Sequence, residues 1–187
     1  SIFLENLQDS DPNKGVLQAA LAKSKFLRQT SRYAKIPGQA LPEPVMQEID
    51  SLYSSVITGE IESTLPTYEQ ALWEYASFVH EVKQERISAY SLYRSIHDRA
   101  EDEGEKIRAL VMIAAITMEL ADSELSYYNE VRRLCDQIFS DYPDDYGKAK
   151  SVARLMKAES YLFEGATSQA IDSLSELAWN TDIPMHE

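Results

Sequence analysis

The stretch AESYLFEGATSQAIDSL, residues 158–174, decides the fold. Apolar and small residues recur at helical spacing on both sides of Gly165, so the stretch predicts two helices in succession. Glycine adopts a left-handed backbone without steric strain, which marks Gly165 as the end of the first helix. Ala158 and Ala170 are small enough to lie where the two helices cross. The stretch therefore predicts the corner of a helical hairpin.

Helical spacing continues along the rest of the chain, and no segment alternates with the period of two that a strand requires. Prolines gather between residues 12 and 66, and the long stretches without Pro or Gly favour helix. The helices are expected over Val16–Ala34, Pro44–Ile57, Pro66–Val82, Ile87–Ala100, Lys106–Ala121, Leu125–Ser140, Tyr146–Glu164 and Gln169–Trp179.

Short polar segments separate these helices and supply candidate caps. EDEGE, residues 101–105, is expected to interrupt the helical structure before the helix that begins at Lys106. Asp122 or Ser123 is the expected N-cap of the helix that follows, and Thr167 or Ser168 that of the last helix. Residues 63–187 then form three helical hairpins. Residues 1–62 form N-terminal helices with the Pro-rich linker KIPGQALPEP, packed on the hairpins in one structural unit.

The hairpins are similar to one another. When Ala89, Val131 and Ala170 are aligned, the residues four and seven positions after each of them also correspond. The three aligned positions are separated by 42 and 39 residues. The last hairpin resembles the heart of a tetratricopeptide repeat (TPR), with a small residue at Ala158, an aromatic at Tyr161, then Gly165 and the small Ala170. The aligned later positions are Tyr93, Cys135 and Leu174, then Ile96, Ile138 and Leu177.

The resemblance implies an all-α solenoid, in which antiparallel hairpins stack into a right-handed superhelix. Pro143 of DYPD stands where the family has its hairpin-closing proline. The family period is about 34 residues, shorter than the separations found here, and the good match covers only the last hairpin. A divergent helical repeat of another type and an all-α bundle remain as alternatives.

Charge limits the range of partners. The 187 residues carry a net charge of −13, divided as −3 over residues 1–100 and −10 over residues 101–187. An acidic surface repels phosphate, so nucleic acid is not an expected partner. Residues 12–42 contain no Asp or Glu but carry basic side chains between Lys14 and Lys35. This basic segment either contacts an anionic surface, docks on the acidic remainder or forms a solvated helix face.

No catalytic or cofactor-binding set is found in the sequence, which predicts a non-enzymatic protein without cofactor or metal. His80, His97 and His186 lack the spacing of metal ligands. Cys135 lies on an apolar stripe and is expected to be a buried structural residue rather than a nucleophile. The acidic turns EDEGE and DYPDDYG lack the spacing of a calcium loop. Nucleophile-elbow, phosphate-loop and dinucleotide motifs are not present.

The sequence predicts a cytoplasmic protein. Its longest apolar run, ALVMIAAITMELA, is shorter than a membrane span and is expected to be a buried helix. One cysteine cannot form an internal disulfide, which is compatible with a reducing compartment. No signal peptide is recognisable, and the chain does not begin with Met, which is typical of a processed or excised piece.

Two functions follow from this architecture. The first is a protein-binding scaffold that holds a peptide or protein segment on its concave face, which the first helix of each hairpin would line. The second is a structural subunit of a larger assembly, or a fragment of a longer repeat protein. An α-helical enzyme is a weaker third reading. The expected lining residues are Glu74, Phe78, Glu81, Met112, Ile116, Glu119, Leu155, Glu159 and Leu162.

The C-terminal helix carries apolar residues on more than one face, including Ile171, Leu174 and Trp179. A terminal repeat that lacks a polar outer face exposes apolar side chains, which are stable only when another protein surface packs on them. We therefore expect this helix, around Trp179, to pack against a second copy in a homodimer or against another partner.

Overall fold

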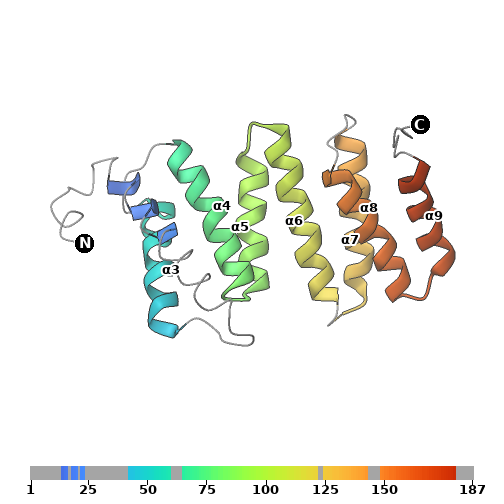
Figure 1. The fold of residues 1–187 in the computed structure, drawn as a ribbon, viewed down its shortest axis with the longest axis horizontal. Coiled ribbons are helices and arrows are strands. Elements are labelled where there is room, and N and C mark those ends of the chain that lie inside the picture. The colour runs from blue at the N-terminus through green and yellow to red at the C-terminus, as the bar shows by residue number, and fades with distance from the viewer. Residues whose placement is uncertain are drawn as a thin grey trace, which may run out of the picture. The chain divides into compact units, whose positions relative to one another are not determined.

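The computed structural model of the chain describes residues 14–16, 18–20, 22–23, 42–59, 65–121, 124–142 and 148–179, with backbone alone at 65 and 176–179. This part of the chain is helical and contains no strand, which confirms the all-α prediction for it. The principal helices are α3 (Glu43–Ile57), α4 (Leu65–Glu81), α5 (Arg86–Arg99), α6 (Glu103–Ala121), α7 (Ser126–Asp141), α8 (Lys148–Phe163) and α9 (Thr167–Trp179), as Figure 1 shows.

The chain divides into two compact units, Ser1–Leu92 and Tyr93–Glu187, with the division inside α5. In the first unit, α3 packs on α4. In the second, α6 packs on α7 and α8, α7 packs on α8, and α8 packs on α9. Successive helices from α6 to α9 alternate in direction (Figure 1). The predicted boundary between residues 62 and 63 falls outside the described residues.

The core of the first unit is built from the facing sides of α3 and α4. On α3, Ile49, Tyr53 and Val56 recur at helical spacing and are buried. Phe78 of α4 is fully buried, and its ring stacks on that of Tyr75 at 6.5 Å. Burial of such large side chains stabilises a fold by about 1.5–3 kcal/mol each. The ring of Tyr53 on α3 lies 5.9 Å from that of Tyr75 on α4, so an aromatic contact joins the two helices.

The second unit has its core around α6. Its buried residues cover more than one stripe of the helix, because α7 and α8 both pack against it. A helix that is apolar on most sides is buried on most sides, so the prediction of a buried helix for ALVMIAAITMELA is confirmed. The buried residues of α6 are Ile107, Ala109, Leu110, Ile113, Ala114, Ile116, Thr117 and Ala121.

The corner between α8 and α9 has the predicted glycine geometry. Gly165 has a φ of +77°, in the left-handed region. Its N–H donates to the carbonyl of Leu162 at 3.0 Å, and the Ala166 N–H donates to the carbonyl of Tyr161 at 2.8 Å. These two bonds form a Schellman motif, which satisfies carbonyls at the end of a helix. Ala158 and Ala170 are 1% and 0% exposed, as a close helix crossing requires.

The starts of α6 and α9 each lie at least two residues before the predicted positions. The break predicted at EDEGE is present between α5 and α6, but it covers only residues 100–102, and Glu103 already belongs to α6. The Asp102 carboxylate accepts a hydrogen bond from the Glu105 N–H at 2.8 Å and caps this helix. α9 begins at Thr167, so Thr167 lies inside the helix rather than before it. The Ala170 N–H donates a hydrogen bond to the carbonyl of Ala166 at 3.2 Å, so Ala166 is the residue that precedes the helix.

Several predictions lie outside the described residues. They concern the caps Asp122 and Ser123, Pro143 of the DYPD turn, His186, and most of the expected helix Val16–Ala34. The backbone of Trp179 belongs to α9, but its side chain also lies outside the description.

Candidate functional site

The predicted binding residues of α8 form one exposed stripe. Leu155 is 47% exposed and Leu162 is 50% exposed, with the half-buried Glu159 between them. Val152, 42% exposed, extends the stripe by one turn toward the N-terminus of the helix. These residues are spaced by three and four positions, so they share one face of α8. Leu155 and Leu162 are therefore accessible to solvent, and their contact with a ligand stays a prediction.

The predicted residues of α6 are only partly accessible. Met112 and Glu119 are half-buried, whereas Ile116 is fully buried. The reason is that α6 is covered by both α7 and α8. Ile116 is therefore a core residue, and the prediction that it contacts a ligand is wrong for this conformation.

The predicted residues of α4 are divided between core, helix contact and solvent. Phe78 is fully buried, which corrects its assignment to a binding surface. The Glu74 carboxylate accepts a hydrogen bond from the Tyr53 hydroxyl of α3 at 3.0 Å and pairs with Lys23 at 2.6 Å. Glu81 is exposed. Since Tyr53 lies on α3 and Glu74 on α4, this hydrogen bond joins the two helices.

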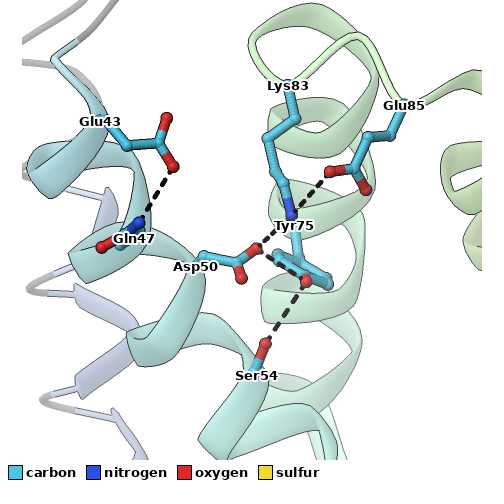
Figure 2. A network of polar contacts seen from close by, with 7 residues as sticks. All are labelled: Glu43, Gln47, Asp50, Ser54, Tyr75, Lys83 and Glu85. Atoms are coloured by element: carbon cyan, nitrogen blue, oxygen red, sulfur yellow. Dashed lines mark hydrogen bonds and ion pairs between the residues drawn. The ribbon is translucent and has the colours of Figure 1, made fainter.

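A polar network connects α3 with the C-terminal end of α4 (Figure 2). The same Asp50 oxygen accepts a hydrogen bond from the Tyr75 hydroxyl and one from the Lys83 ammonium, each at 3.0 Å. The Ser54 hydroxyl lies 3.3 Å from that of Tyr75, and Lys83 also pairs with Glu85 at 3.2 Å. These contacts anchor the end of α4 on the middle of α3.

An open pocket of about 470 Å³ lies beside this network. Gln84, at its rim, has a φ of +57°, and the following N–H, of Glu85, donates to the carbonyl of Val79. This turn after α4 directs Lys83 toward α3. The pocket is lined by Glu43, Met46, Gln47, Asp50, Val82, Lys83, Gln84 and Glu85.

The electrostatics of the network favour protonated side chains. Burial raises the pKa of Tyr75, and the hydrogen bond to Asp50 adds to the rise. Burial opposes the charge of Lys83, but hydrogen bonds to Asp50 and Glu85 outweigh it, and the pKa of Lys83 is raised. A lysine that keeps its proton has no lone pair for nucleophilic attack. The arrangement serves helix packing better than covalent catalysis.

This network predicts a loss of stability in alkaline solution. Tyr75 and Lys83 titrate at ordinary pKa values of 10.0 and 10.5 when unfolded, and at higher values when folded. Their contribution is complete below pH 10 and is lost as the pH rises through the raised values, because the unfolded chain releases protons first. When the pH is raised from 8 to about 11, the unfolding free energy of the wild type should fall. We expect that fall to be about 1 kcal/mol smaller in Asp50→Asn, which lacks the carboxylate of the network.

Urea unfolding at a series of pH values measures this difference. At neutral pH, Asp50→Asn is expected to lower the unfolding free energy by about 1 kcal/mol, since Lys83 loses its charged partner on α3. Exposed Asp172→Asn on α9 is the matched control and should change neither quantity. Parallel pH profiles for wild type and Asp50→Asn would contradict the role given to the network.

The remaining candidate catalytic or metal-binding side chains are buried or lie close to a polar partner. Cys135 is fully buried, as predicted, and burial together with Asp136 raises the pKa of its thiol to about 12. His97 Nδ1 lies 3.1 Å from Asp98 at the exposed end of α5. Within the described residues, no three His, Cys, Asp or Glu side chains gather closely enough to hold a metal ion.

Sequence reasoning missed the Asp50 network because its members are separated by 25 and 33 residues. Each of these polar side chains is, on its own, typical of a solvent-exposed helix face, and no local spacing links one to another. The pairing depends on the approach of α3 to α4, which only the folded chain defines.

None of the helices in the described part of the chain is sufficiently long and apolar to cross a lipid bilayer. Comparison with known proteins adds no relative: no protein-family model, no curated protein and no solved structure matches the chain.

Proposed function

We propose that the chain is a non-enzymatic protein-interaction scaffold of the TPR-like helical-repeat type. Its binding surface is the exposed stripe of α8, and the ligand is a segment of another polypeptide. A reducing, cytoplasmic compartment belongs to the same proposal, since the lone buried thiol of Cys135 needs no oxidising environment.

The exposed stripe carries the proposal. Val152, Leu155 and Leu162 are 42–50% exposed and lie on one helical face. Exposed apolar side chains are unremarkable when scattered singly, but three on one helical face, interrupted only by Glu159, are typical of a contact surface. Amphipathic segments bind such rows through apolar residues spaced by three and four positions.

The packing of the second unit supports the repeat part of the proposal. α8 contacts both helices of the preceding hairpin, α6 and α7, and α9 contacts α8. Stacked helical hairpins have this nearest-neighbour pattern. The Schellman corner at Gly165 and the two buried alanines also agree with the TPR-like features of the last hairpin.

Selection from a displayed peptide library tests the function. We expect the wild type to enrich peptides with apolar residues at helical spacing, and Leu155→Asp to lose at least about tenfold in affinity for them, because a charged group in an apolar contact is costly. The control is Ile87→Asp, which places the same charge at a 75% exposed position on α5. Failure to enrich peptides, or equal binding by wild type and Leu155→Asp, would exclude peptide recognition by this stripe.

A second candidate function is that of an assembly subunit. Ile171 and Leu174 on α9 are 61% and 38% exposed. In an assembly, further protein would cover them as a following repeat does. This candidate predicts a stable oligomer and no selection of short peptides.

A further inference from the structure

The stripe of α8 carries charges as well as apolar groups. Lys148 is exposed and lies four residues before Val152, on the same face. The resulting row is Lys148, Val152, Leu155 and Glu159, with spacings of four, three and four residues. Residues 148 and 159 are eleven positions apart, which is close to three turns of an α-helix, so all four side chains lie on one face of α8.

The two charges of the row have no ion-pair partner among the described residues. Other charged side chains of the hairpin do: Lys157 pairs with Asp136 at 2.6 Å, and Glu164 pairs with Arg132 at 2.7 Å. Lys148 and Glu159 are thus positioned for a contact outside the chain. They carry opposite charges and lie on either side of the two apolar residues.

This order of residues is self-complementary. When a second α8 lies antiparallel, with a two-fold axis midway between residues 153 and 154, Val152 of one copy faces Leu155 of the other. Lys148 then faces Glu159 of the other copy, and symmetry creates each contact twice. A parallel pair would place Lys148 beside Lys148 and Glu159 beside Glu159, which is repulsive.

We infer that the stripe of α8 binds a second copy of this chain, forming an antiparallel two-fold dimer with two Lys148–Glu159 ion pairs around a Val152–Leu155 centre. The inference rests on the proposed function, because it names the occupant of the proposed binding surface. A single helix–helix seam is small, and interfaces below about 1,200 Å² are typically weak. The expected dissociation constant is on the order of 10–100 µM.

Charge exchange provides the test. Light scattering and sedimentation equilibrium, from micromolar to millimolar protein, should show the wild type passing from monomer to dimer. Lys148→Glu alone and Glu159→Lys alone should each weaken dimerisation at least about tenfold, since two attractive pairs become repulsive. The double variant exchanges the two charges and should return to within about threefold of the wild type.

A mixture of the two single variants is the decisive sample. One chain then has two acidic groups and the other two basic groups at the seam, so we expect a heterodimer although neither variant dimerises well by itself. Circular dichroism verifies that each variant is folded. A wild type that stays monomeric at millimolar concentration, single variants that dimerise as the wild type does, or a mixture that stays monomeric would each overturn the inference.

The same samples separate this inference from the proposed function. If the wild type is monomeric but selects peptides through Leu155, the scaffold function stands and the homodimer is wrong. If dimers form and respond to charge exchange, but no peptide is selected, the homodimer stands and recognition of other proteins by this stripe is wrong.

Discussion

Replacing Ala170 with Trp is expected to lower the unfolding free energy of the second unit by about 3 kcal/mol or more, at the upper end of the range for overpacking. Ala170 is fully buried where α9 packs on α8, and Ala158 on the facing helix is 1% exposed. An indole at this position must separate the two helices. Urea unfolding followed by circular dichroism measures the loss.

The neighbouring residue provides the control for this substitution. Ile171 lies on the same helix and is 61% exposed. Ile171→Trp adds a comparable ring without entering the helix contact, so we expect a change within about 0.5 kcal/mol. Equal stability of Ala170→Trp and Ile171→Trp would show that α8 and α9 do not cross closely at Ala170.

Replacing Arg132 with Met is expected to destabilise the second unit by about 2 kcal/mol. The Arg132 side chain is 12% exposed, and its guanidinium pairs with Glu164 at 2.7 Å. It also donates to Asn129 and lies 4.7 Å from the centre of the Tyr161 ring. Its loss removes several bonds and leaves Glu164, at 28% exposure, without this partner. Water reaches Glu164, which keeps the loss below the 3–5 kcal/mol of a fully buried pair.

The adjacent arginine distinguishes this effect from a simple loss of charge. Arg133 is 57% exposed and pairs with Glu130 along the same helix at 2.6 Å. Arg133→Met should therefore change the unfolding free energy by no more than about 0.5 kcal/mol. Arg132→Lys should recover only part of the loss, because an ammonium cannot reproduce the planar contact with Tyr161. Equal effects of Arg132→Met and Arg133→Met would contradict the bridging role of Arg132.

The sequence by itself determined the helices and the hairpin corner. Backbone hydrogen bonds in a helix join residues four apart, so the spacing of apolar residues and the position of Gly165 contain what is needed. The burial of Cys135 and Ala170 followed from their place on apolar stripes. Leu155 and Leu162 were predicted to line a surface, and both are exposed on α8.

Only the tertiary structure decided which helical faces are free. Phe78 and Ile116 were predicted to line the same surface as Leu155 but are fully buried, and α7 and α8 both pack on the helix that carries Ile116. The Asp50–Lys83 contact joins residues 33 apart through the packing of α3 on α4. Burial depends on which distant segments meet, and that choice minimises the free energy of the whole unit rather than of any local stretch.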